Sequence, residues 1–135
     1  MRDYLFRAKS TELLVGSDQW VYGFGVQKIE YTDGTFSYAM HSENGVLEVD
    51  PETAGQYTGC LDFYDGDIAR SPGGAIGMIT WHDSWCGFYF KQVLGHNECG
   101  ELVWMISSVP LYNDLPRYTK LGNRFDNPEL LEAVT

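Results

Sequence analysis

The chain has 135 residues, with nine Lys and Arg against nineteen Asp and Glu, and a formal net charge of −10 at pH 7. This length suits about one domain, and the 44% hydrophobic content exceeds what a disordered chain carries, so we expect a folded core. A charge of this sign repels nucleic-acid phosphates and anionic membrane surfaces. Because no run of Lys or Arg offsets it, we expect neither direct nucleic-acid binding nor membrane binding.

The cysteines and the N-terminal segment indicate the compartment. Three cysteines form an odd set without the dense spacing of a secreted disulfide scaffold, which favours a reducing environment. Charges at Arg2, Asp3 and Arg7 interrupt a segment too polar for a signal peptide, and no apolar run approaches the roughly 18 residues that span a bilayer. We therefore expect a cytoplasmic protein.

Alternating apolar residues predict strands in the first part of the chain. Residues 2–9 alternate with period two, residues 13–15 continue or return that strand, and residues 46–49 form another short strand that ends at Asp50-Pro51.

Between these strands, Asp33-Gly34 separates residues 28–32 from residues 35–40, a pattern typical of a β-hairpin with a two-residue type I′ turn. In that register one set of side chains shares an apolar face, while Lys28, Glu30 and Ser37 point outward. The predicted apolar set is Ile29, Tyr31, Phe36, Tyr38 and Met40.

Turn-punctuated apolar runs continue to the C-terminus. Strands are expected at residues 66–70, 77–81, 87–93, 101–106 and 118–125. Asp126-Asn127-Pro128-Glu129 is typical of a helix start, and Leu130, Leu131 and Val134 give that helix an apolar side. The pattern predicts one mainly β domain over residues 1–135. Residues 1–54 form an N-terminal β-meander, and residues 55–135 hold a small SH3-like β-barrel from Gly66 to Phe125 with a short C-terminal helix.

Four short motifs carry a family resemblance. They are Phe6-Arg7-Ala8, Gly55-Gln56-Tyr57-Thr58-Gly59, Gly66-Asp67-Ile68, and Gly122-Asn123 followed by Asn127-Pro128-Glu129-Leu130. In this order the chain resembles the YopX family of small phage and prophage proteins. The family's longer charged loop between Gly59 and Gly66 is shortened here to residues 60–65. The resemblance implies a mainly β fold, a phage or prophage origin, a bacterial host cell and self-association, and it brings no established catalytic residues.

Two pairs of metal-ligand residues have short internal spacing. His82 and Cys86, with His96 and Cys99, would bind a tetrahedral zinc ion if the two loops met. The alternative is that the cysteines are small strand-end residues and the histidines are polar loop residues. The sequence leaves both readings open, and we assign no metal.

Asp62, Asp65 and Asp67 lie within six residues and could bind a hard cation or serve in acid–base chemistry. With His82 they would suit a metal-dependent hydrolase, the least favoured of the functions considered. Carboxylates at this spacing more often bond nearby backbone amides in a turn. Since residues 71–75 lack the pattern of a phosphate loop and no serine-nucleophile motif occurs, we expect no catalytic residues, no cofactor and no enzyme.

Aromatic residues are frequent in the second half of the chain. They pack in the core or, where exposed, contact a partner; the set is Trp81, Trp85, Phe88, Tyr89, Phe90 and Trp104. We expect a noncatalytic phage accessory protein that binds an unidentified protein partner or self-assembles as a homo-oligomer. The alternative is an acidic inhibitor that mimics DNA and occupies a host nucleic-acid-binding protein.

Overall fold

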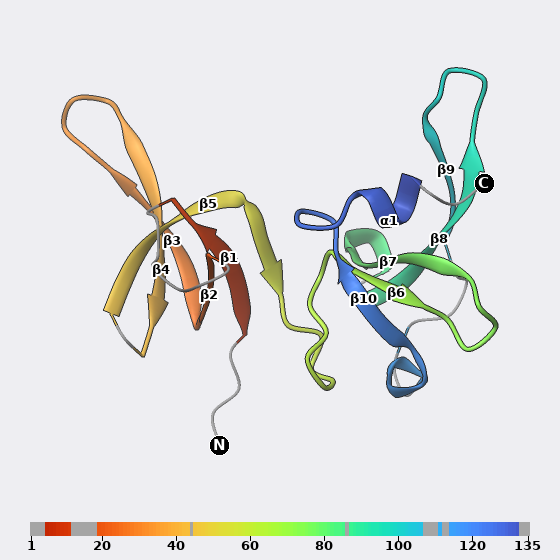
Figure 1. The fold of residues 1–135 in the computed structure, drawn as a ribbon. Coiled ribbons are helices and arrows are strands. Elements are labelled where there is room, and N and C mark those ends of the chain that lie inside the picture. Colours follow the sequence, from red (N-terminus) through yellow and green to blue (C-terminus); the bar gives the residue numbers. More distant parts are fainter. Residues whose placement is uncertain are drawn as a thin grey trace. The chain divides into compact units, whose positions relative to one another are not determined.

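A computed structural model describes residues 5–11, 19–43, 45–85, 87–106, 111 and 114–132. The chain divides into two compact units, which we call unit 1 (Met1–Tyr57) and unit 2 (Thr58–Thr135). Each unit contains one antiparallel five-stranded sheet, so the mainly β prediction is confirmed (Figure 1). The strand expected at residues 13–15 lies outside the described residues. No helix in the described ranges is long and apolar enough to cross a membrane.

Unit 1 is built from five strands in the order β2-β1-β5-β4-β3. Their bounds are β1 (Phe6–Ser10), β2 (Trp20–Gly23), β3 (Gly25–Glu30), β4 (Phe36–Ser42) and β5 (Gly45–Gln56). The first and last strands in this order, β2 and β3, are consecutive in the chain with only Phe24 between them. The Phe24 N–H donates to the His41 carbonyl of β4 at 2.8 Å, so the sheet curls back on itself. The curl encloses a core of Ala8, Val21, Met40 and Val49.

The β3–β4 hairpin forms as predicted, but its turn is one residue longer than expected. The Tyr31 N–H donates to the Thr35 carbonyl at 2.9 Å, and the Gly34 N–H donates to the Tyr31 carbonyl at 3.1 Å. Only Gly34 has a positive φ, of 89°, whereas a type I′ turn needs two such residues. The loop is therefore a three-residue turn whose glycine sits in the left-handed region.

The longer turn reverses the predicted faces of the hairpin. Tyr38 opposes Lys28 and Phe36 opposes Glu30, so these four side chains share one face. Ile29 opposes Ser37 on the other face, contrary to the prediction. The physical reason is that a shift of one residue in register moves every side chain of a strand to the opposite face.

Strand β5 extends well beyond the predicted end at Asp50-Pro51. It pairs with β4 through Glu48 and with β1 from Val49 onward. The pairing with β1 shifts register between Arg7 and Lys9, and the Lys9 N–H donates to the Thr53 hydroxyl at 2.8 Å. This irregularity accommodates Pro51, which has no N–H for a regular ladder.

Unit 2 has the strand order β10-β6-β7-β8-β9. Its elements are β6 (Asp67–Arg70), β7 (Ile76–His82), the 3-10 turn η1 (Asp83–Trp85), β8 (Gly87–His96), β9 (Leu102–Ile106), the 3-10 turn η2 (Leu115–Arg117), β10 (Thr119–Asn123) and α1 (Glu129–Glu132). In the described residues no pairing joins β9 to β10, so closure of the predicted barrel is not detected there. The strands and the final helix are otherwise found near their predicted positions.

Apolar side chains cover both faces of the unit 2 sheet. One face packs against the loop before β6 and against η2, with a core of Phe63, Ala69, Ile79, Phe90, Leu111 and Leu115. The other face packs against α1, with a core of Ile68, Val93 and Leu131. A sheet buried on both faces leaves the hairpin tips and edge strands as its available surfaces.

Candidate functional site

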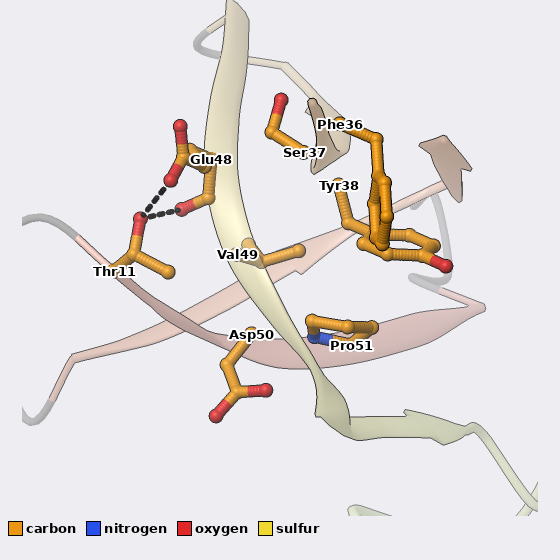
Figure 2. A pocket seen from close by; sticks show the side chains of 8 residues that line it. All are labelled: Thr11, Phe36, Ser37, Tyr38, Glu48, Val49, Asp50 and Pro51. Carbon is orange, nitrogen blue, oxygen red and sulfur yellow. Dashed lines mark hydrogen bonds between the residues drawn. The ribbon is translucent and has the colours of Figure 1, made fainter. Parts of the chain in front are cut away.

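Strands β4 and β5 separate at one end of the unit 1 sheet and leave an open groove. Their pairing ends at Ala39 and Glu48, after which β5 turns toward β1. The space between them has a volume of about 310 Å³, near the lower end for ligand pockets (Figure 2). We call it the β4–β5 groove; its lining is Thr11, Phe36, Ser37, Tyr38, Glu48, Val49, Asp50 and Pro51.

The two sides of the groove differ in chemistry. Phe36, Tyr38, Val49 and Pro51 lie on one side of β5 and form an apolar wall, as Figure 2 shows. The rings of Phe36 and Tyr38 meet edge to face, with their centroids 6.0 Å apart. Phe36 is 57% exposed although it is a large apolar residue, so the Phe36 end of this wall is open to a ligand, whereas Val49 belongs to the buried core.

Carboxylates occupy the other side of β5. Glu48 and Asp50 point away from Val49 and Pro51 (Figure 2). The Thr11 hydroxyl donates to Glu48 Oε1 at 3.0 Å and orients that carboxylate. Among the residues that the structure describes, neither carboxylate has an ion pair with Lys, Arg or His. The groove therefore combines an aromatic wall with two carboxylates that form no ion pair in the described residues, although Lys9 opposes Asp50 in the β1–β5 ladder.

A second exposed feature is the tip of the β7–β8 hairpin in unit 2. Trp85 is 50% exposed and stacks on His82 with a centroid distance of 4.0 Å and an interplanar angle of 10°. Trp85 also meets Tyr89 edge to face at 5.0 Å. On the other face of the hairpin, the rings of Trp81 and Phe88 meet edge to face with their centroids 5.2 Å apart. We call these five residues the aromatic tip.

The six aromatic residues singled out from the sequence thus have different environments. Tyr89 and Phe90 are buried, and Trp104 is half-buried beneath the Lys91 ammonium, 4.6 Å from its ring centroid. Trp81 and Trp85 are the exposed members. The set therefore contains both residues that pack in the core and residues that are exposed near the β7–β8 turn.

The three predicted carboxylates do not meet in one site. Asp67 is fully buried, accepts the Tyr64 N–H at 2.7 Å, and lies 3.3 Å from Lys120 Nζ. Asp62 is exposed and lies 3.6 Å from the same ammonium, while Asp65 accepts the Trp81 N–H at 3.3 Å. These are turn and ion-pair contacts, and the described part of the chain holds no group of three metal-ligand side chains.

The four predicted zinc ligands are also separated. His82 pairs with Gly87 at the start of β8, whereas His96 ends that strand and Cys99 lies in the turn beyond. Ten residues of extended strand span roughly 30 Å, so His82 and His96 cannot share a metal ion. Cys86 lies outside the described residues.

Motif residues in unit 1 lie where β1 meets the end of β5. Phe6 opposes Gln56 and Arg7 opposes Gly55 in adjacent pairs of the ladder. The Arg7 side chain is buried, and the Tyr57 N–H continues the pairing by donating to the Leu5 carbonyl at 2.7 Å. These positions hold the curled sheet together.

The next motif residues, Thr58 and Gly59, organise the loop before β6. The Thr58 hydroxyl donates to the Phe63 carbonyl at 2.9 Å and accepts the Cys60 N–H at 3.3 Å. Gly59 between them has a φ of 87°. The loop so formed carries Phe63 into the core of unit 2.

The remaining motif residues converge at the ends of β6 and β10. Asp67 opposes Asn123, and the Gly66 carbonyl accepts the Arg124 N–H at 3.0 Å. A Cβ atom on Gly122 would overlap the Asn127 side chain, so only glycine allows this approach.

Asn123 is the centre of the turn between β10 and α1. Its side-chain oxygen accepts the N–H groups of Phe125 at 3.0 Å and Asp126 at 2.9 Å. Pro128 and Glu129 follow at the start of α1, as the sequence predicted. These contacts account for the motif residues as parts of the turn between β10 and α1, and in the described residues they leave no ligand site there.

No protein-family model matches the chain, and no curated protein matches it either. The YopX resemblance therefore rests on the short motifs alone and stays a prediction.

Acidic residues are spread over both units. Unit 1 contains four basic and nine acidic residues and unit 2 contains five and ten, so each has a net charge of −5. A DNA mimic needs its negative charge concentrated on one face. The charge of each unit does not say how its acidic residues are distributed over faces, so the DNA-mimic alternative stays a prediction.

Sequence reasoning missed the β4–β5 groove. It ended a strand at Asp50-Pro51, at the point where β5 moves from β4 to β1. A proline within an apolar strand run was the available signal, because such prolines mark edges and bulges. The separation itself depends on pairing between distant residues, which the local pattern does not contain.

Proposed function

We propose that this chain is a noncatalytic protein-interaction module that binds a partner protein through the β4–β5 groove. The observation that carries the proposal is the separation of β4 and β5 after Glu48, which leaves an aromatic wall and a strand edge open together. Strand edges bind extended peptides through main-chain hydrogen bonds, and neighbouring side-chain pockets add specificity.

The wider setting that we propose is that of a phage or prophage accessory protein in a bacterial cell. Its support is the set of YopX-like motifs and the absence of a recognisable catalytic motif in the sequence. The acidic charge of both units disfavours nucleic acid as the direct ligand. Self-association through the aromatic tip is compatible with this role, because exposed aromatic residues are common in interface centres.

A capture experiment with two matched variants tests the proposal. Phe36 and Tyr31 are aromatic residues of one hairpin with exposures of 57% and 50%, but only Phe36 lines the groove. The immobilised chain is incubated with lysate of the cells that produce it. We expect wild type and Tyr31→Ala to retain the same protein and Phe36→Ala to lose it at least about tenfold. Equal retention by Phe36→Ala would contradict the proposal.

A further inference from the structure

We infer that the β4–β5 groove accepts an extended segment whose side chains alternate between apolar and basic, added as a strand along β4. This inference rests on the proposed function and specifies its partner. It follows from the direction of the backbone groups of β4, the different sides of the groove, and the distribution of charge.

The backbone of β4 is available on the groove side. Because the Tyr31 N–H donates to the Thr35 carbonyl, the antiparallel ladder directs the N–H and C=O groups of residues 35, 37 and 39 toward β3. The same alternation directs those of Phe36 and Tyr38 toward the groove. The Ala39–Glu48 pair is of the non-hydrogen-bonded kind, so the ladder bond beside it takes the Tyr38 carbonyl. The N–H and C=O of Phe36 and the N–H of Tyr38 remain for an added strand.

An added strand would present its side chains alternately to the two sides of the sheet. One set would face the rings of Phe36 and Tyr38 beside Pro51 and would have to be apolar. The other set would face the side where Glu48 and Asp50 lie. Because successive side chains of a strand face opposite sides, the ligand is expected to alternate apolar residues with residues that complement carboxylates.

Charge selects a basic partner over a second copy of the chain. In the part of the chain that the structure describes, the Glu48 and Asp50 carboxylates form no ion pair. Lys9, which opposes Asp50 in the ladder, has its ammonium 5.5 Å from the centroid of the Trp20 ring. Lys28 lies over the Phe36 ring at 4.5 Å but pairs with Glu30 at 3.4 Å. A second copy would bring another net charge of −10, whereas Lys or Arg side chains would complement the carboxylates.

Three synthetic peptides test the inference on the full chain by NMR titration. The first is a capped hexapeptide of alternating Lys and Val, the second replaces Lys with Glu, and the third carries N-methyl groups on alternate amides of the Lys–Val peptide. We expect the first peptide to shift the amide signals of Phe36 and Tyr38, and the other two to bind at least about tenfold more weakly.

Charge-neutral variants of the protein supply the second arm. Glu48→Gln can still accept the Thr11 hydroxyl, and Asp50→Asn can still accept the Glu52 N–H, which Asp50 Oδ1 receives at 3.0 Å. The double variant should keep its fold and bind the Lys–Val peptide about tenfold more weakly. Glu132→Gln, an exposed residue of unit 2, is the control and should bind as wild type does.

Several results would overturn the inference. They are equal binding of the Glu–Val or N-methylated peptide, an unchanged affinity of the double variant, or no shift at Phe36 and Tyr38 with any peptide. Concentration-dependent shifts of these amides without peptide would indicate a second copy instead.

If a captured protein depends on Phe36 while the Lys–Val peptide fails to bind, the proposed interaction role stands and only the proposed ligand pattern is wrong. Capture that is indifferent to Phe36 removes the proposed function itself.

Discussion

The carboxylate of Asp33 organises the tip of the β3–β4 hairpin. Its Oδ1 accepts the Thr35 hydroxyl at 2.6 Å and the Thr35 N–H at 3.0 Å. These bonds hold the pKa of Asp33 below its ordinary value of 3.8, and the bond from the Thr35 hydroxyl has the larger effect. A lowered pKa stabilises the hairpin above the unfolded-state pKa, and this contribution is lost as the pH falls through the folded-state pKa.

Thr35→Val tests that account, because it removes the hydroxyl and keeps the shape and the backbone N–H. We expect the pKa of Asp33, followed by NMR titration of its carboxyl carbon, to rise toward 3.8. Ser37→Ala, two residues further along the hairpin and without a bond to Asp33, is the control. An unchanged pKa in Thr35→Val would show that the hydroxyl does not stabilise the charged form.

Asp67, in contrast to the exposed Asp33, is a buried carboxylate of unit 2. It has no exposed surface and joins the Tyr64 N–H to the Lys120 ammonium. Asp67→Ala should lower the free energy of unfolding of unit 2 by about 3 kcal/mol, because it breaks a buried ion pair and a buried hydrogen bond. Asp62→Ala removes the exposed partner of the same ammonium and should change it by less than about 1 kcal/mol. Urea denaturation measures both, and similar losses would refute a structural role specific to Asp67.

At the scale of elements, three hairpins close with the same turn. In the loops that begin at Tyr31, Ser71 and Asn97, the first residue donates its N–H to the carbonyl of the fifth, and a glycine in fourth place donates back. The glycines, Gly34, Gly74 and Gly100, have φ angles of 89°, 93° and 82°. Turn composition therefore predicted where these hairpins lie.

The same composition could not predict the register. Asp33-Gly34 fits a two-residue loop, and the structure uses three residues. Since one residue reverses the faces of a strand, the hairpin was correct in position and wrong in orientation. The β4–β5 groove was out of reach for the same reason, because it depends on which strand β5 pairs with at each point along its length.

The helix α1 illustrates an element held by packing. It has four residues, too few to persist alone, and Leu131 inserts beside Ile68 and Val93. Leu131→Ala should lower the stability of unit 2 by about 2–3 kcal/mol in urea denaturation. Glu132→Ala, exposed on the same helix, should leave it nearly unchanged, and equal effects would mean that α1 is not docked by Leu131.

At the scale of the whole molecule, composition and turn spacing predicted a mainly β chain, and that prediction is confirmed. They placed the curled sheet in the second half of the chain, as a barrel from Gly66 to Phe125, and closure is not detected there. The curled sheet lies in unit 1, because β2 and β3 form one bent stretch around Phe24, while the unit 2 sheet is open across its described strands. Curling determines where strands must separate, and it therefore determines where unit 1 exposes a strand edge.

The most direct test of the interaction role is amide hydrogen exchange of the full chain with and without its captured partner. If the partner binds along β4, exchange at Phe36 and Tyr38 slows strongly, because their N–H groups become paired, while exchange at the aromatic tip of unit 2 is unchanged. Unchanged exchange at Phe36 and Tyr38, with protection elsewhere on the chain, would contradict the account.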